Sequence, residues 1–214
     1  MDPASDLAEI VDAAIAGDES AFRMLYREVQ PGLLRYLRGL VGEDAEDVAS
    51  ETWLQIARDI RSYRSEGAGF RGWAVTIARH RALDHLRYHQ RRPSMPAAAE
   101  QFADLAGFDD TESRAMEAVA MHTAIEWIAT LPRDQAEAIL LRVVVGLDAA
   151  AAAGVLGKRA GAVRTAAHRG LRRLADQLER NPEAGLPRTR PDRSERSRSV
   201  GVTPPRPTTP EGEK

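Results

Sequence analysis

Residues 148–178 read DAAAAAGVLGKRAGAVRTAAHRGLRRLADQL, and this stretch decides the fold of the C-terminal half. The carboxylate of Asp148 can cap a short helix over 149–156 by accepting from its first backbone amides. Gly157 can supply the turn that follows, and a longer helix is expected over 160–178. We expect one apolar face of that helix to be buried, formed by Val163, Ala167, Leu171, Leu174 and Leu178. The arrangement predicts a helix-turn-helix.

The turn and the opposite face of the longer helix carry hydrogen-bond donors. They are Lys158, Arg159, Arg164, Thr165, His168, Arg169 and Arg172. An arginine can bind guanine through two hydrogen bonds in the major groove, and neighbouring cations neutralise phosphates. We therefore predict that these residues bind duplex DNA. The alternative is the solvated basic face of an ordinary amphipathic helix.

A second basic helix is expected over 70–88, where four arginines accompany the aromatic side chains of Phe70 and Trp73. Cations can hold a nucleic-acid backbone while ring faces stack on unpaired bases. The alternative for Trp73 is a plain core residue. With one arginine from the preceding loop, the residues predicted to bind separated strands are Arg64, Phe70, Trp73, Arg79, His80, Arg81 and Arg87.

The same helix offers a competing metal site. His80, Asp84 and His85 have spacings that place ligands on one helix face. The surrounding arginines would repel a divalent cation, and no second carboxylate cluster is placed to complete the shell. We therefore expect no metal and no cofactor.

Helical patterns fill most of the remaining chain and predict an all-α protein. We expect helices over 6–16, from a Ser20 cap to Gly42 with a kink or restart at Pro31, and over 43–60. A second helical set begins near Thr111. The predicted organisation is a domain at 1–92, a flexible acidic linker at 93–119, a helix-turn-helix domain at 120–180 and a disordered tail at 181–214.

Composition excludes several classes of protein. The chain has no cysteine, so disulfides, thiolate catalysis and cysteine-bound metals are excluded. The net charge of −2 means that affinity for nucleic acid must come from local basic patches. The acidic N-terminus has no signal-peptide pattern and no apolar run approaches the ~20 residues that span a bilayer. A cytoplasmic protein without a membrane partner is expected.

Several segments, in this order and spacing, resemble the extracytoplasmic-function group of bacterial RNA polymerase sigma factors. Residues 21–53, which include DAEDVASETW at 44–53, resemble the core-polymerase-binding segment of that family. FRGW at 70–73 through RHRALD at 79–84 resembles its −10-element helix. LPRDQ at 131–135 through 169 resembles its −35-binding domain. The resemblance covers about residues 20–92 and 120–178.

The resemblance implies roles for particular residues. Asp47, Glu51 and Thr52 would bind the clamp of the largest polymerase subunit. The loop over 62–69 would receive a flipped base of the −10 element, and the C-terminal domain would meet the flap of the second-largest subunit. Promoter DNA and an anti-sigma factor would be further partners. Departures from the family pattern at Ser50, Ala149, Ala151, Ala152, Arg159 and Ala166 mean that no promoter sequence can be carried over.

Three functions compete on these residues. The first is a sigma factor that binds polymerase core and directs promoter recognition and melting, which is not an enzyme. The second is a stand-alone helix-turn-helix regulator, which needs neither the acidic helix over 43–60 nor a second basic helix. The third is a metal-dependent nucleic-acid hydrolase, which needs the site at His80, Asp84 and His85. The sequence favours the first.

Overall fold

The computed structural model describes residues 3–64, 68–91 and 111–180, and every regular element in these ranges is helical. The all-α prediction is thereby confirmed. The elements are α1 Pro3–Ile15, α2 Glu19–Val41, η1 Gly42–Asp44, α3 Ala45–Asp59, η2 Ile60–Ser62, α4 Gly69–Arg91, α5 Thr111–Ala129, α6 Arg133–Ile139, η3 Leu140–Val144, α7 Ala149–Leu156 and α8 Ala160–Arg180. The predicted tail and most of the predicted linker lie outside the described residues.

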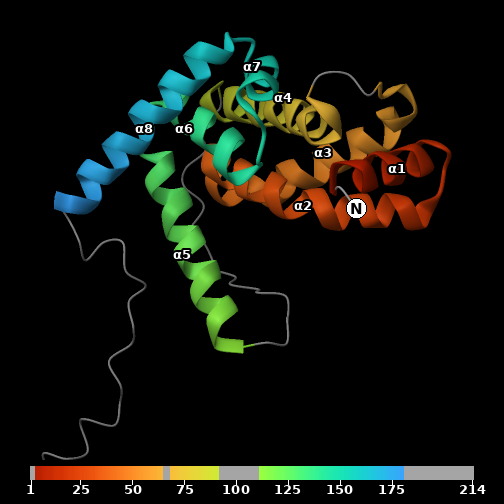
Figure 1. Cartoon of the computed structure of the whole chain (residues 1–214), viewed down its shortest axis with the longest axis horizontal. Coiled ribbons are helices and arrows are strands. Elements are labelled where there is room, and N and C mark those ends of the chain that lie inside the picture. The colour runs from red at the N-terminus through yellow and green to blue at the C-terminus, as the bar shows by residue number, and fades with distance from the viewer. Residues whose placement is uncertain (1–2, 65–67, 92–110, 181–214) are drawn as a thin grey trace, which may run out of the picture.

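Helices α1 to α4 pack together as an N-terminal helix group (Figure 1). The core of this group includes Leu25, Leu37, Ile56 and Val75. The cap of α2 differs from the prediction. Asp18, and not Ser20, precedes the helix, and its Oδ1 accepts from the backbone nitrogens of Ser20 and Ala21.

Helix α2 runs without interruption past Pro31, so the expected restart of the chain at that residue is wrong. Proline lacks the amide hydrogen that would bond one turn back, and it usually kinks or ends a helix. Here Val29 before the proline is buried, and so are Leu33, Tyr36 and Leu37 after it. We attribute the continuity of α2 to this packing on both sides of Pro31.

Helices α5 to α8 form a C-terminal helix group whose centre is the helix-turn-helix of α7 and α8. Both predicted end signals of α7 are confirmed. Asp148 Oδ1 accepts from the backbone nitrogen of Ala151 at 2.7 Å. Gly157 has a φ of 63° and a ψ of 34°, a left-handed conformation that glycine adopts without steric cost. Pro132 also begins α6, as its N-cap.

The buried face of α8 differs from the predicted one. It passes through Val163, Ala167 and Gly170, whereas Leu171 and Leu178 are 48% and 43% exposed. A Cβ atom on Gly170 would lie 2.7 Å from Cδ1 of Ile139 and 3.2 Å from Cβ of Gln135, so α6 crosses α8 closely here and a side chain at this position would force its neighbours to shift. The stripe therefore runs through the glycine, and the leucine beside it faces outward.

The two helix groups pack against each other (Figure 1). Helix α2 contacts α5 and η3, and α4 contacts α7. Gly39 of α2 provides one close approach, because a Cβ atom there would lie 2.6 Å from Cδ1 of the buried Leu140. Within the described part of the chain, no helix is long and apolar enough to cross a membrane.

Candidate nucleic-acid and polymerase interfaces

The basic face of α8 and of the turn before it is open to solvent. All seven residues predicted to bind duplex DNA are exposed. None of their cationic side chains forms an ion pair with another described residue. Thr165 uses its hydroxyl within the helix, donating to the carbonyl oxygen of Gly161 at 3.0 Å. The arginines are therefore available for an anionic partner, and Val163 and Ala167 hold the helix in place from behind.

Asp134, at the start of α6, was not predicted to bind DNA. This carboxylate lines a shallow concavity of about 320 Å³ together with Lys158, Thr165 and Arg169 of the helix-turn-helix. A carboxylate among cations repels phosphate and can accept a hydrogen bond from the amino group of cytosine. Its position next to three predicted DNA-binding residues was not visible in the sequence, because α6 and α8 meet only in the folded chain.

The acidic face of α3 carries two of the three residues predicted to bind polymerase. Asp47 and Glu51 are exposed and, four residues apart, lie on one helix face. Thr52 is fully buried, and its hydroxyl donates to the carbonyl oxygen of Val48 at 2.7 Å. A polymerase surface cannot reach it, so its predicted contact is wrong. Leu54, three residues beyond Glu51, is 59% exposed and was missed by the sequence analysis.

The aromatic residues at the start of α4 form a cluster with Tyr63. The ring centroid of Trp73 lies 5.1 Å from that of Tyr63 and 5.5 Å from that of Phe70. Phe70 and Tyr63 are buried, whereas Trp73 is half-buried. Phe70 therefore belongs to the core and supports the cluster, and the partly open Trp73 is the ring that a base could reach.

The basic residues of α4 differ in their surroundings. His80 is exposed. Arg81 donates to Gln55 Oε1 at 2.9 Å and lies 3.8 Å from a carboxylate oxygen of Glu51, which joins α4 to the acidic face of α3. Arg87 donates to Asp84 Oδ1 at 2.8 Å. Arg64, before the helix, is exposed and donates to the carbonyl oxygen of Tyr63 at 3.0 Å.

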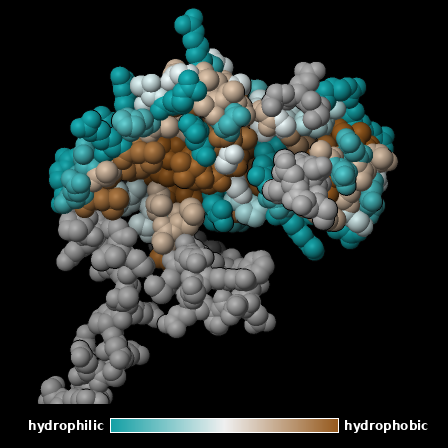
Figure 2. All heavy atoms as spheres, in the orientation of Figure 1, coloured by the Kyte–Doolittle hydropathy of each residue, from teal (hydrophilic) through white to brown (hydrophobic). Residues whose placement is uncertain are grey.

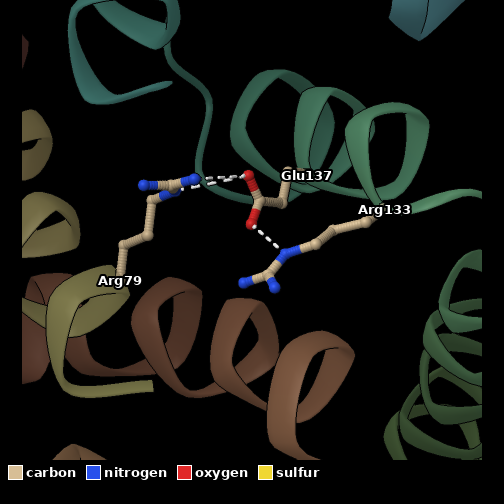
Figure 3. A network of polar contacts seen from close by, with 3 residues as sticks. All are labelled: Arg79, Arg133 and Glu137. Atoms are coloured by element: carbon tan, nitrogen blue, oxygen red, sulfur yellow. Dashed lines mark hydrogen bonds and ion pairs between the residues drawn. The ribbon is translucent and has the colours of Figure 1, made fainter. Parts of the chain in front are cut away.

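Arg79 is held by the C-terminal helix group (Figure 3). Its Nε and Nη2 donate to Glu137 Oε2 at 3.3 and 3.1 Å, and Arg133 Nε donates to Glu137 Oε1 at 3.0 Å. Glu137 is the one charged residue buried among the described residues, with 4% of its side chain exposed. A buried charge of this kind requires hydrogen-bonded partners. We name this three-residue network the interdomain clasp.

The charges of the interdomain clasp act on the pKa of the nearby Tyr36 phenol. Burial raises the pKa of the Tyr36 phenol far above its usual range, and the Glu137 carboxylate raises the pKa further. The phenol therefore stays neutral. The sequence offered no sign of this arrangement, since Arg79 and Glu137 are 58 positions apart.

The metal site considered on α4 is not assembled. Asp84 pairs with Arg87, and His85 instead faces Asp44, with 2.9 Å between Nε2 and Oδ2. The structure thus separates the ligand set on which the hydrolase alternative depended.

Comparison with known proteins agrees with this arrangement. Residues 25–92 match the family of sigma-70 region 2, and residues 124–174 match that of sigma-70 region 4. The ECF RNA polymerase sigma factor SigD of Mycobacterium tuberculosis is 36% identical over 80% of this chain and 84% of its own length. The ECF RNA polymerase sigma factor BldN of Streptomyces coelicolor is 32% identical over 82% of this chain and 69% of its own.

Two solved structures share the fold at lower identity. CnrH, in complex with the cytosolic domain of CnrY, aligns with a TM-score of 0.58 and 20% identity over 80% of this chain and 96% of CnrH. The sigma factor RpoE of Bartonella quintana, in complex with the anti-sigma factor NepR, aligns with a TM-score of 0.57 and 21% identity over 75% of this chain and 98% of RpoE. With two sigma-70 regions in order and relatives of this identity over most of its length, the chain belongs to the ECF family of RNA polymerase sigma factors.

Proposed function

We propose that this sigma factor binds polymerase core through α3, reads the −35 duplex through α8 and holds the separated −10 strands along α4. As a member of its family the protein serves transcription initiation with RNA polymerase and is not a stand-alone helix-turn-helix regulator. The relatives are sigma factors and not enzymes. The observation that carries the proposal is the separation of an exposed acidic face on α3 from an exposed basic face on α8.

The acidic face of α3 suits a basic partner with an apolar centre. Asp47, Glu51 and Leu54 are spaced so that they share one side of the helix. An exposed leucine beside carboxylates can act as the desolvated anchor of an interface, and the charges can orient the partner. We therefore add Leu54 to the proposed core-binding surface and remove Thr52 from it.

The C-terminal helix group offers a second surface for polymerase. Figure 2 shows hydrophobic surface over the part of the molecule where the C-terminal helices lie in Figure 1. Exposed large hydrophobic side chains of this group include Val143, Leu171 and Leu178. Exposed apolar patches of this kind mark interaction sites, and we assign this one to the flap of the second-largest subunit.

In the interdomain clasp, Arg79 must separate from Glu137 before it can bind promoter DNA. Arg79 is 20% exposed while it is paired with Glu137, so it cannot reach a phosphate in this arrangement. We propose that the two helix groups separate when the chain joins polymerase, which releases Arg79 to the −10 strands. Trp73, His80, Arg81 and Arg87 do not depend on this step.

An anti-sigma factor is a further proposed partner, since RpoE of Bartonella quintana was solved with one. Because its proposed partners are polymerase and promoter DNA, we propose that the protein acts in the cytoplasm. The linker over 93–119 is proposed to run through polymerase toward its active site; α5 begins inside this stretch, at Thr111.

A pull-down with core polymerase tests the proposal. Asp47→Arg with Glu51→Arg should abolish binding, because both carboxylates are exposed and the reversed charges would repel a basic partner. The matched control reverses two exposed carboxylates on another helix, Glu9→Arg with Asp12→Arg on α1, and should bind like the unaltered chain. Unchanged affinity of the α3 variant, or equal loss in both variants, would contradict the assignment of α3.

A further inference from the structure

A cluster of three potential metal ligands lies where η1 meets the C-terminal half of α4. Asp44, His85 and His89 each offer one ligand atom, and these atoms all lie within 4.8 Å of one another. The His85 and His89 rings are separated by 4.3 Å between centroids, and His85 Nε2 is 2.9 Å from Asp44 Oδ2. None of these three side chains has a role in the proposed DNA or polymerase contacts.

We propose that Asp44, His85 and His89 bind a divalent transition-metal ion, zinc in the first place. Two imidazole nitrogens and one carboxylate oxygen form a ligand set that zinc accepts, with a fourth position left for water. The two histidines are four residues apart on one face of α4, and Asp44 approaches from a separate element. The inference does not depend on the proposed function.

The geometry requires only small changes of side-chain rotamer. With zinc–ligand bonds of about 2.0–2.1 Å, neighbouring ligands of a tetrahedral ion lie about 3.3–3.4 Å apart. The 2.9 Å between His85 Nε2 and Asp44 Oδ2 is shorter than this value, and all the ligand atoms lie within 4.8 Å of one another. The ends of the side chains can move because Asp44 and His89 are exposed and His85 is half-buried. The metal would replace the direct Asp44–His85 contact by two bonds to one ion.

The charge around the cluster favours a cation. Glu43 lies beside Asp44 in η1, and Asp47 lies in the first turn of α3, where Glu46 is already paired with Arg38. On α4, the guanidinium of Arg87 is already paired with Asp84. The repulsion by arginine that argued against a site at His80, Asp84 and His85 is therefore weaker here.

A bound ion would tie two functional segments together. Asp44 directly precedes α3, which carries the proposed core-binding face, and the histidines lie on α4, which carries the proposed −10 surface. A metal bridge between the two would fix the C-terminal half of α4 against the start of α3. The ion is thus expected to stabilise the fold, since it binds the folded arrangement of ligands and not the unfolded chain.

The chain allows a clean test, because it has five histidines and no cysteine, and all five histidines are among the described residues. The full chain is stripped with chelator and titrated with zinc chloride by calorimetry. We expect one ion per chain. Loss of an outer hydrogen-bond partner alone lowers metal affinity about 10- to 100-fold, so His89→Ala, which removes a ligand, should lower it by at least about 100-fold. Asp44→Asn should also lower it.

The matched control is His122→Ala. His122 also pairs with a carboxylate, with 3.3 Å between its Nε2 and Glu126 Oε1, but no third ligand joins them among the described residues. It should leave zinc affinity unchanged. Zinc at a hundredfold excess over its dissociation constant should raise the unfolding temperature by about 5–10 °C in the unaltered chain and in His122→Ala, but not in His89→Ala. Absence of stoichiometric binding, or equal losses in His89→Ala and His122→Ala, would overturn the proposal.

Discussion

Arg79→Ala should loosen the contact between the two helix groups. Arg79 supplies both hydrogen bonds to Glu137 Oε2, and Arg133 supplies the bond to Oε1. The variant therefore leaves half of a buried carboxylate without a donor among the described residues. Removal of one partner from a buried ion pair costs about 3–5 kcal/mol. Because Arg133 remains and Arg79 is partly exposed, we expect about 2–3 kcal/mol.

The interdomain clasp joins residues of the two helix groups. The lost free energy should therefore shift the equilibrium between chains whose groups are packed together (docked) and chains whose groups are separated. At about 1.4 kcal/mol per factor of ten, the ratio of docked to separated chains should fall about 30- to 140-fold. The absence of native cysteine makes the assay direct. Spin labels on Ser50→Cys of α3 and Ala175→Cys of α8, both exposed positions, report the distance distribution between the groups. The distribution should broaden in Arg79→Ala.

The matched control is Arg38→Ala. It removes the ion pair with Glu46, which lies within the N-terminal helix group and has both side chains exposed. Such surface pairs contribute about 0–1 kcal/mol, so the distance distribution should stay narrow. An unchanged distribution in Arg79→Ala would refute the role given to the clasp, and broadening in the control would show that the effect is unspecific.

The remaining predictions concern single side chains. Gly170→Ala should lower the free energy of unfolding by about 1–3 kcal/mol in chemical denaturation, because its Cβ would collide with Ile139. Thr52→Val should leave affinity for polymerase core unchanged in a binding titration, because the side chain is buried. Arg164→Ala should weaken closed-complex binding about 5- to 150-fold in a mobility-shift titration with holoenzyme, because one base contact contributes about 1–3 kcal/mol. Trp73→Ala should spare closed-complex binding and impair melting, a defect that a pre-melted template should relieve; a thermal melt checks its fold.

The elements that depend on neighbouring residues were predictable from the sequence. Asp148 and Gly157 begin and end α7 as expected, since a cap and a left-handed turn involve only nearby backbone atoms. Asp47 and Glu51 are exposed, as their predicted contact with polymerase requires. The burial of Thr52 had a visible signal, because Val48, Thr52 and Ile56 are spaced by four and all are buried.

The features that could not be predicted from the sequence depend on which helix packs against which in the folded chain. Periodicity marked an apolar stripe on α8 but not the close crossing of α6 at Gly170, which turns Leu171 outward. The pairing of Arg79 with Glu137 links residues 58 positions apart, and both charges would otherwise be expected at the surface. Tertiary packing also overrides the local preference of Pro31 to end a helix.

Permanganate reactivity of promoter thymines tests the central claim most directly. A promoter is first obtained by mapping transcription start sites after overexpression of the chain. Unpaired thymines near the −10 element should then appear only when the chain and polymerase core are both present, and they should disappear with Asp47→Arg and Glu51→Arg. Specific protection of the duplex by the chain alone, with no unpaired thymines when core is added, would contradict the account.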